Sequence, residues 1–382
     1  MMLAVSQTKP RIPYVDLAGQ IAPLKAELLE AVAGVLEHGH FILGEQVAEF
    51  EERFAALCGV RHALAVNSGT DALVLALKAV GVGPSDEVIT VPNSFVASTA
   101  SIRLAGARPV FVDVGEDYNL DPGKIEPALT ARTKAVLPVH LTGQPCDMES
   151  ILKIARARGL AVIEDCAQAV GAEYHGRPVG SLGTVGCFSL HPLKTLSACG
   201  DGGVVTTNDF SLFEQMRIAR NHGLRGRDDC AFWSCNSRLD TIQAAILLVK
   251  LRYLEEWTER RRQNARLYRK YLAGIGEIQI PIEEVNVRAV YHTFVIQAEQ
   301  RDLLRSQLGV RGIETAVHYP VPIHLSAAGQ ELGYPVGSFP VAEEQAQRIL
   351  SLPVYPELNE AQIQRVCESI RAFYRDRPKL AK

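Results

Sequence analysis

The segment CFSLHPLKTLSACGDGG, residues 187–203, places one lysine in an unusual setting. A predicted strand ends at a Ser-x-His-Pro turn, Lys194 follows, and a Gly-Asp-Gly-Gly loop closes the segment. Most lysines are solvated surface residues, and that is the ordinary interpretation of a single lysine. Lys194, however, follows a buried strand among small and apolar residues. Desolvation of this kind lowers the pKa of a lysine and favours Schiff-base chemistry.

A carboxylate ends another predicted strand in the segment VIEDCAQAVGA, residues 162–172. Ligands of open α/β sheets bind beyond the carboxyl ends of the strands, where Asp165 is expected to lie. Gln168 follows three residues later and can face the same side. A helix N-cap is an equally good interpretation of Asp165 taken alone.

The segment VNSGTDAL, residues 66–73, joins a predicted strand to a predicted helix. Ser68 and Gly69 suit a tight turn, and the first backbone N–H groups of the helix then form an anion site. Simple Ser/Thr capping of the helix is the alternative. Taken together, the three segments match pyridoxal phosphate. Its phosphate needs N–H donors, its ring nitrogen needs a carboxylate, and its aldehyde needs a lysine.

The elements that must position these residues alternate along the first two thirds of the chain. Near-continuous apolar runs predict strands buried on both faces, and helical patterns lie between them. This alternation predicts an α/β fold with a mostly parallel sheet. The predicted strands are 62–66, 87–92, 108–114, 134–140, 161–166, 187–191 and 203–207, and the helices are 71–80, 98–105, 148–157 and 212–220.

The pattern changes after about residue 236. Residues 238–271 keep helical spacing without Pro or Gly and predict one long helix or two joined helices. A strand at 293–298 and helices near 340–350 and 360–374 follow. We therefore expect a large domain over residues 14–250 and a smaller α/β domain over 251–382. The N-terminal segment is expected to pack on the smaller domain.

Charge and composition exclude several classes of protein. The chain has 382 residues, and 40 Lys and Arg against 43 Asp and Glu give a net charge of −3, so we expect no nucleic-acid partner. It has neither an apolar run of about 18 residues nor a signal-peptide pattern, so we expect a cytoplasmic protein without a membrane partner. The eight cysteines lack metal-site spacing, so we expect reduced thiols and no metal.

The chain closely resembles the DegT/DnrJ-type nucleotide-sugar aminotransferases from about residue 14 to residue 370. This resemblance implies the aspartate-aminotransferase-like fold (fold type I), with a large domain built on a seven-stranded mixed sheet and a smaller C-terminal α/β domain. The segments that carry it are GHFILGEQVAEFE (39–51), NSGTDAL (67–73), PVFVDV (109–114), VHLTGQPCDM (139–148), EDCAQAVGA (164–172), SLHPLK (189–194), GDGG (200–203), NSRLDTIQAA (236–245), HYPVPIH (318–324) and LSLPVYP (350–356).

The resemblance also implies a role for each matched residue. Lys194 is expected to form the Schiff base and shuttle the proton, Asp165 to pair with the pyridine nitrogen, and Gln168 to hydrogen-bond the ring 3-hydroxyl. Asn236 is expected to reach the cofactor phosphate of the neighbouring subunit, which implies a homodimer with shared active sites. The remaining expected contacts are Gly69, Thr70 and Ser189 to the phosphate, Phe95 to the ring face, and Phe41, His318, Tyr319 and His324 to the substrate.

The implied reaction is a transamination in two halves with pyridoxamine phosphate as the intermediate. L-Glutamate is the expected amino donor, and the expected acceptor is a keto group of a nucleotide-activated deoxysugar. The SGTDAL form, with Asp71, favours members that aminate C3. A 4-keto nucleotide sugar, a keto-cyclitol and a free keto-sugar acid remain open as acceptors, and dTDP, UDP and GDP remain open as the nucleotide.

Other branches of the fold fit less well. One dehydratase branch has His where this chain has Lys194, and another needs clustered cysteines for an iron–sulfur cluster. Cysteine desulfurases need a mobile nucleophilic Cys. A non-catalytic, cofactor-binding regulator remains the alternative of a different class, although both Lys194 and Asp165 are present. The chain departs from the family at Leu190, Thr142 and Cys166, where Phe, Tyr and Ala are common, and Thr142 is expected to affect the substrate side.

Overall fold

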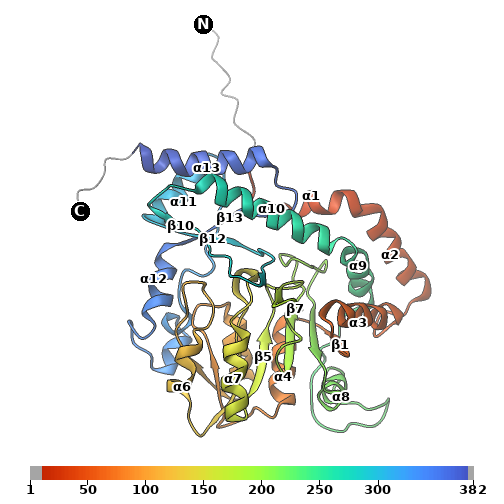
Figure 1. The fold of residues 1–382 in the computed structure, drawn as a ribbon. Helices are drawn as coiled ribbons and strands as arrows, with labels where there is room; N and C mark the ends of the chain where they lie inside the picture. The colour runs from red at the N-terminus through yellow and green to blue at the C-terminus, as the bar shows by residue number, and fades with distance from the viewer. Residues whose placement is uncertain (1–10, 377–382) are drawn as a thin grey trace.

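The computed structural model of the chain describes residues 11–376. Its centre is a seven-stranded sheet with helices packed against it (Figure 1). Only β9 runs antiparallel to its neighbours, so the prediction of a mostly parallel, seven-stranded sheet is confirmed. In spatial order the strands are β1 (His62–Val66), β9 (Gly203–Thr207), β8 (Val185–Ser189), β5 (Ala161–Asp165), β4 (Thr133–Val136), β2 (Glu87–Thr90) and β3 (Arg108–Phe111).

The four predicted helices of this region form within a few residues of their expected bounds. They are α4 (Gly69–Ala79), α5 (Val96–Leu104), α7 (Met148–Arg158) and α8 (Phe210–Ala219). Local capping fixes several of their ends, because Ser68, Asp147 and Asp209 accept hydrogen bonds from first-turn N–H groups. Helix α4 packs on β8 and β9, and α7 packs on β5. A shorter helix, α6 (Ile125–Ala128), precedes β4.

Strand direction gathers the chemical segments at one edge of the sheet. Strands β1, β8 and β5 are parallel, so their carboxyl ends at Val66, Ser189 and Asp165 lie on the same edge. The antiparallel β9 begins at that edge, because Gly203 pairs with both Val66 and Ser189. The turn before α4, the Asp165 carboxylate and the loop that carries Lys194 therefore meet in space.

The long helical pattern after residue 236 forms two helices, α9 (Thr241–Leu251) and α10 (Leu254–Leu272). Helix α10 packs against α13 (Glu360–Arg375), and these two helices lie above the main sheet in Figure 1. Beneath them lies a small sheet in the order β10 (Ile278–Gln279), β12 (Phe294–Ala298) and β13 (Ile349–Leu352), with α11 (Arg301–Val310) against it.

The helix predicted near 340–350 ends earlier than expected. Helix α12 spans Pro340–Arg348, and Ile349–Leu352 form β13 instead. The expectation was wrong for Ile349 and Leu350, because the segment Ile-Leu-Ser-Leu pairs antiparallel with β12. Such a pairing depends on a segment that is distant in sequence, so the local spacing of apolar residues gives little indication of it.

The hydrophobic cores show how the two predicted domains relate. One cluster fills the main sheet and its helices. A second cluster joins residues of α10, β12, β13 and α13, and Ile12 belongs to it. Ile12 also bridges Ile313, so the N-terminal segment packs on this second core. Residues 323–346, however, contribute Ile323 and Phe339 to the first core. The division at residue 250 stays a prediction.

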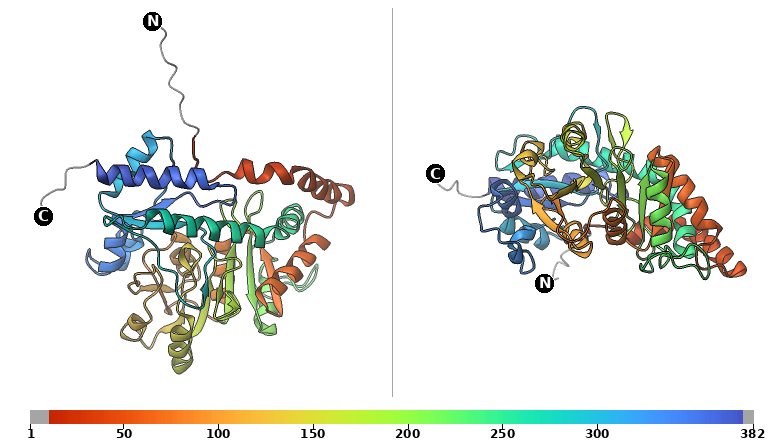
Figure 2. Two further views of the ribbon diagram at one scale, coloured as in Figure 1. Left: turned by 45° about the horizontal axis from the view of Figure 1, so that its top comes forward. Right: turned by 90° about the horizontal axis from the view of Figure 1, so that it is seen from below.

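The helices before β1 have no counterpart among the predicted elements. They are α1 (Leu17–Ile21), α2 (Lys25–His38) and α3 (Glu45–Cys58). Helices α2 and α3 pack on α9 at one end of the molecule, as both views of Figure 2 show. A third small core, with Leu28 and Trp257, lies there. Strands β6 (Glu173–Tyr174), β7 (Arg177–Pro178) and β11 (Val287–Arg288) form a further small sheet.

Two further features bear on the expectations from composition. Within residues 11–376, no helix combines the length and the apolar character needed to cross a membrane. All eight cysteines carry free thiols. Five of them are buried, whereas Cys199, Cys230 and Cys235 are exposed and do not contribute to a core.

Candidate active site

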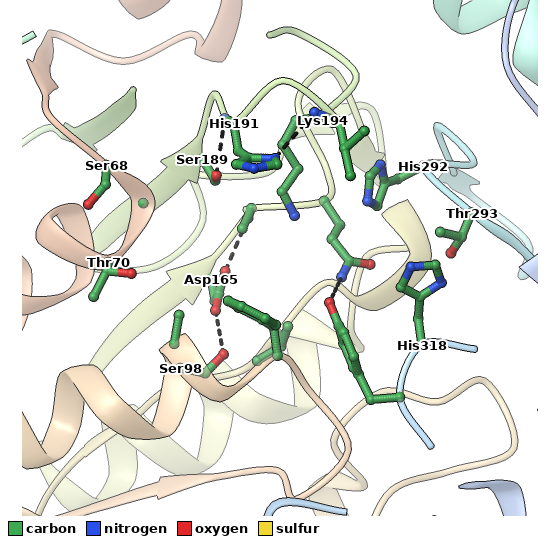
Figure 3. Close-up of a pocket in the computed structure, with 18 of the residues that line it drawn as sticks. Ser68, Thr70, Ser98, Asp165, Ser189, His191, Lys194, His292, Thr293 and His318 are labelled. Atoms are coloured by element: carbon green, nitrogen blue, oxygen red, sulfur yellow. Dashed lines mark hydrogen bonds between the residues drawn. The ribbon is translucent and has the colours of Figure 1, made fainter. Parts of the chain in front are cut away.

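A pocket of about 360 Å³ opens at the edge of the sheet where the chemical segments meet. Segments from the N-terminus, the main sheet, α10 and the chain before β12 all line it. Figure 3 shows Lys194 pointing into its centre, with Ser68, Thr70 and Ser189 to one side and His292 and His318 to the other. The pocket brings together these predicted residues: Gly69, Thr70, Phe95, Asp165, Gln168, Ser189, Lys194, His318 and Tyr319.

Lys194 is held in a tight turn that follows β8. Its backbone N–H donates to the carbonyl of His191 at 2.8 Å, and the N–H of Leu193 donates to Nδ1 of His191 at 3.3 Å. Burial lowers the pKa of Lys194 to about 8, although the nearby Asp165 carboxylate opposes this shift. At pH 7 roughly a tenth of a lysine with this pKa is neutral and can act as a nucleophile.

Asp165 is a buried carboxylate at the end of β5. Burial raises its pKa, whereas hydrogen bonds and the charge of Lys194 lower it. One of its oxygens accepts from Ser98 Oγ at 2.7 Å, and the other accepts from the N–H of Ala167 at 3.1 Å. Ser98 in turn accepts from Ser94 Oγ at 3.1 Å. A carboxylate fixed in this way is ready to hold a cation, because an opposite charge offsets its desolvation.

The N-terminus of α4 forms the wall beside Lys194. Ser68 caps this helix by accepting from the N–H of Asp71 at 3.1 Å. A Cβ on Gly69 would lie 2.7 Å from Ser189 Cβ, and a Cβ on Gly203 would lie 2.3 Å from the Ser68 carbonyl oxygen. Only glycines allow this close approach of helix to sheet. The result is a cradle of N–H groups with the Thr70 and Ser189 hydroxyls, which fits a phosphate.

Gln168, Tyr319 and Phe95 border the pocket near Asp165. Gln168 Oε1 accepts from the Thr142 N–H at 2.7 Å, so its Nε2 is left to face Tyr319 OH at 3.4 Å. Thr142 adopts a left-handed backbone conformation, with φ at 62°. The Phe95 ring lies 5.7 Å from the Tyr319 ring and is 54 % exposed. An apolar face open to the pocket suits stacking on a flat ring.

The structure does not bring His324 into the pocket. Its side chain is fully buried, and Nε2 lies 3.0 Å from Glu343 Oε1. The Phe339 ring meets it edge-on at 4.8 Å. The resemblance to the family implied a place for His324 beside the substrate. The chain between Tyr319 and His324 instead turns into the core of the main sheet.

Phe41 and Asn236 are also absent from the pocket of the same chain. Both are exposed, and their segments lie together, because the Thr241 N–H donates to the Phe41 carbonyl at 3.0 Å. Apolar side chains are exposed on the same segments, including Ile42 at 46 % and Trp233 at 96 %. Roles for Phe41 and Asn236 in an active site therefore stay predictions that require a second subunit.

Several site residues were missed from the sequence. Ser98 holds Asp165 from helix α5, and Arg261, His292 and Thr293 line the pocket from α10 and the segment before β12. None of them belongs to a motif with a distinctive residue pattern. The one signal present was the spacing of Ser94 and Ser98, which are four positions apart, with Ser98 at the start of the helix predicted over 98–105.

A buried carboxylate next to Asp165 supports the same strand end. Glu164 accepts from the N–H groups of Gly180, Leu182 and Gly183 at 2.9, 2.9 and 2.6 Å. His140 Nε2 lies 3.1 Å from it. The ligand-type atoms of His140, Glu164 and Cys166 lie within 4.8 Å of one another. Because both Glu164 oxygens already hold backbone N–H groups, this cluster clamps the 180–183 loop against β5.

Comparisons with known proteins agree with this geometry. Residues 23–371 match the model of the DegT/DnrJ/EryC1/StrS aminotransferase family. The chain is 46 % identical over 367 residues to the "Pleiotropic regulatory protein" of Geobacillus stearothermophilus, covering 95 % of this chain and 99 % of the relative. It is 45 % identical over 365 residues to the dTDP-3-amino-3,4,6-trideoxy-alpha-D-glucose transaminase of Streptomyces venezuelae, covering 95 % and 96 %.

A solved structure shows the same fold over nearly the whole chain. DesV of S. venezuelae, in complex with a ketimine intermediate, superposes with a TM-score of 0.94 at 43 % sequence identity, covering 98 % of this chain and 100 % of that one. Aminotransferases of this family use pyridoxal phosphate, and the buried Lys194, the held Asp165 and the N–H cradle fit that cofactor. The chain therefore belongs to the DegT/DnrJ/EryC1/StrS family of pyridoxal-phosphate-dependent sugar aminotransferases.

Proposed function

We propose that the protein transfers an amino group from L-glutamate to the C3 keto group of a nucleotide-activated deoxysugar, as a step in amino-sugar biosynthesis. One observation carries this proposal: Lys194 and Asp165 face one pocket beside the N–H cradle of α4. The name of the S. venezuelae transaminase, which makes a 3-amino sugar, supports C3 as the position. Bound pyridoxal phosphate would supply an electrophilic carbonyl and an electron-withdrawing ring.

Lys194 does the covalent and proton-transfer work in this proposal. Its Nζ is the nucleophile that attaches the cofactor, and burial keeps a usable fraction of it neutral. Once the amino donor has displaced it, the same Nζ would take the proton from the donor's α-carbon and deliver it to C4′ of the bound cofactor. Figure 3 shows the Lys194 side chain reaching into the space between the two walls of the pocket.

Asp165 keeps a positive charge on the ring nitrogen in this proposal. Its carboxylate is fixed by Ser98 and Ala167, so it need not reorganise when a cation arrives. The positive charge of the ring nitrogen would lower the pKa of Asp165 and stabilise its ionised form. Gln168 Nε2 and the Phe95 ring would orient the ring of the cofactor from its edge and its face.

The phosphate of the cofactor would bind the first-turn N–H groups of α4 with Thr70 and Ser189. The helix dipole adds a favourable field for the negative charge. Asp71, one residue after Thr70, does not enter this contact, because it accepts from Ser237 Oγ at 2.9 Å. That hydrogen bond ties α4 to the segment that carries Asn236.

His318 and Tyr319 form the proposed substrate side of the pocket. Burial lowers the pKa of His318 to about 4, and Nδ1 of this side chain lies 2.9 Å from Ser351 Oγ. Burial also raises the pKa of Tyr319 to about 12. Both groups are therefore neutral at pH 7 and would bind sugar hydroxyls by hydrogen bonds instead of by charge.

The active form is proposed to be a homodimer with shared sites. Exposed apolar residues beside Phe41 and Asn236 suit a subunit interface, and neither residue reaches the pocket of the same chain. Across a two-fold axis, each would contribute to the pocket of the partner subunit. Asn236 would then contact the phosphate of the cofactor bound there.

The test is a substrate screen with the purified holoenzyme. L-Glutamate is incubated with dTDP-, UDP- and GDP-linked 3-keto and 4-keto deoxysugars, a keto-cyclitol and a free keto-sugar acid, and release of 2-oxoglutarate is measured. Turnover with a 3-keto nucleotide sugar above the 4-keto isomer is the expected result. Turnover of only a cyclitol or a free sugar acid would contradict the proposed acceptor.

One relative favours a second kind of role, because the G. stearothermophilus protein is named a regulatory protein. The same screen addresses this role. A holoenzyme that turns over none of the acceptors, yet binds the cofactor at Lys194, would support a regulatory role. The presence of Lys194, Asp165 and the cradle in one pocket favours the enzyme.

A further inference from the structure

The wall of the pocket that faces the cradle carries polar atoms without partners. Among residues 11–376, Arg261 Nε, His292 Nδ1 and Thr293 Oγ1 are all buried and accept or donate no hydrogen bond. All three side chains line the pocket. Figure 3 shows His292 and Thr293 on the side away from Ser68 and Thr70, with the Lys194 side chain between the two sides.

Arg261 is a buried cation that lacks a close counter-ion. Its side chain lies on α10 and is only 7 % exposed. Within residues 11–376, its one hydrogen bond joins Nη1 to the Tyr291 carbonyl at 3.5 Å, and it forms no ion pair within 4 Å. Burial lowers its pKa to about 10, while Glu357 attracts it from farther away. Desolvating a guanidinium without a partner is unfavourable, so such a site gains stability when an anion binds.

His292 and Thr293 complete this site with neutral groups. Burial and the positive charges of Lys194 and Arg261 lower the pKa of His292 well below its usual value. His292 is therefore neutral and lies within the electrostatic reach of both the reactive amine and the guanidinium. Its Nδ1 and the Thr293 hydroxyl can each donate one hydrogen bond. A guanidinium fork with two neutral donors suits one carboxylate.

The donor substrate, not the acceptor, supplies the matching anion. An α-amino acid carries a carboxylate on the carbon that reacts, so its charge must lie inside the pocket near Lys194. The charges of a nucleotide sugar lie on the diphosphate attached to C1, two ring positions from C3, and the nucleotide needs a path to solvent. Arg261 is almost entirely inside the protein.

We propose that Arg261, His292 and Thr293 form the subsite that binds a carboxylate of the amino donor and of its oxo-acid product. This inference rests on the proposed function and deepens it, because it gives the donor a place opposite the cofactor cradle. It assigns the discrimination between donor molecules to α10 and to the segment before β12, whereas the acceptor side remains with His318 and Tyr319.

The test measures binding to the holoenzyme instead of turnover. Glutarate, a dicarboxylate without an amino or keto group, and thymidine diphosphate are each titrated calorimetrically into wild type, Arg261→Gln, Arg261→Lys and Thr293→Val. Arg260→Gln is the matched control, since Arg260 is the preceding residue on α10 and pairs with Glu256 at the surface. Thermal unfolding and cofactor absorbance confirm that each variant is folded and loaded.

In Arg261→Gln, glutarate binding is expected to weaken by about 10- to 100-fold, with Arg261→Lys in between. Thr293→Val, which keeps the side-chain volume, is expected to weaken it by about 3- to 10-fold without loss of unfolding temperature. Thymidine diphosphate binding and Arg260→Gln are expected to be unchanged. If Arg261→Gln does not fold, Thr293→Val decides the question.

Two results would overturn the subsite. Unchanged glutarate binding in folded Arg261→Gln or in Thr293→Val would show that the three groups serve the fold alone. Weaker binding of thymidine diphosphate with unchanged glutarate would assign the site to the acceptor's phosphates. Failure of the proposed function is a separate result, since it appears as wild-type holoenzyme that binds glutarate but aminates no sugar in the substrate screen.

Discussion

Burial controls the protonation of the two side chains that face each other in the pocket. The pKa of Lys194 is lowered to about 8 and the pKa of Asp165 is raised, because burial removes each side chain from solvent. Each group offsets part of the other's shift by charge attraction. Asp165 would interact in the same way with the cationic ring nitrogen of a bound cofactor, and this would leave Lys194 free to react.

The lowered pKa of Lys194 predicts how fast the apoenzyme takes up pyridoxal phosphate. The neutral amine is the nucleophile, so the second-order rate constant is expected to rise about tenfold per pH unit below pH 8 and to level off above it. Stopped-flow absorbance of apoenzyme mixed with pyridoxal phosphate measures this rate. A simple alkylamine, measured in parallel, corrects for titration of the aldehyde. A rate that still climbs above about pH 9 would show an ordinary lysine pKa.

Ser98 is a positioning residue that acts through Asp165. Removing its hydroxyl in Ser98→Ala takes away a 2.7 Å hydrogen bond from the carboxylate, and kcat is expected to fall about 10-fold. Ser101→Ala is the control, because Ser101 is equally buried on α5 but donates to the Ser98 carbonyl instead. Steady-state kinetics and a pH profile of the cofactor absorbance compare the two. Equal losses in both variants would assign Ser98 to helix packing.

At the scale of elements, the close approach of α4 to β9 builds the cradle. Strand β9 begins beside the start of α4. Because Gly203 has no side chain, the Ser68 carbonyl can lie directly against this strand. This contact allows the N-terminus of α4 to lie close to the edge of the sheet. The antiparallel direction of β9 is required for this contact. A strand parallel to β1 and β8 would have its last residue, and not its first, at this edge of the sheet.

Gly203→Ala tests that contact. The added Cβ would lie 2.3 Å from the Ser68 carbonyl oxygen, so α4 must shift. We expect stability to fall by about 2 kcal/mol and the affinity for pyridoxal phosphate to fall about 10-fold. Gly34→Ala is the control, because Gly34 lies within α2 with no heavy atom within 4 Å of its added Cβ.

The control is expected to raise stability by about 0.5 to 1 kcal/mol and to leave cofactor binding unchanged, since Ala is the better helix former. Chemical unfolding and titration of the apoenzyme with pyridoxal phosphate measure both quantities. Wild-type cofactor affinity in Gly203→Ala would mean that the cradle tolerates movement of α4, and that the phosphate is held elsewhere.

At the scale of the whole molecule, two of the predicted site residues lie outside the pocket of their own subunit. The pocket contains the lysine, the carboxylate and the cradle, whereas Phe41 and Asn236 lie outside it on exposed, partly apolar segments. Two such subunits related by a two-fold axis would bury these segments and complete both pockets at once. Function would then depend on association.

Mixed dimers test this arrangement. Lys194→Ala and Asn236→Asp, each inactive or weak as a homodimer, are co-expressed with different tags so that mixed dimers form. If Asn236 serves the partner's pocket, each mixed dimer has one intact site, and the unfractionated mixture is expected to regain about a quarter of wild-type activity. If Asn236 serves its own chain, both sites of a mixed dimer carry a defect. No recovery in purified mixed dimers would then contradict the shared site.

The sequence by itself determined the chemistry of the site, because the residues that carry it sit next to strand ends. Lys194 and Gly69 follow short apolar strands and Asp165 ends one, and parallel strands bring such ends to one edge. Seven strands, their approximate bounds and the cofactor all followed from local patterns. These patterns are local because burial and capping act over a few residues.

Only the tertiary structure decided which distant residues join that edge. The order of strands inserts β9 between β1 and β8, and α5, α10 and the segment before β12 deliver Ser98, Arg261 and Thr293 from positions without a motif. His324 failed as a pocket residue for the same reason, since its neighbours in sequence turn into the core. Packing between segments far apart in the chain decides such placements, and the local spacing of apolar residues does not indicate it.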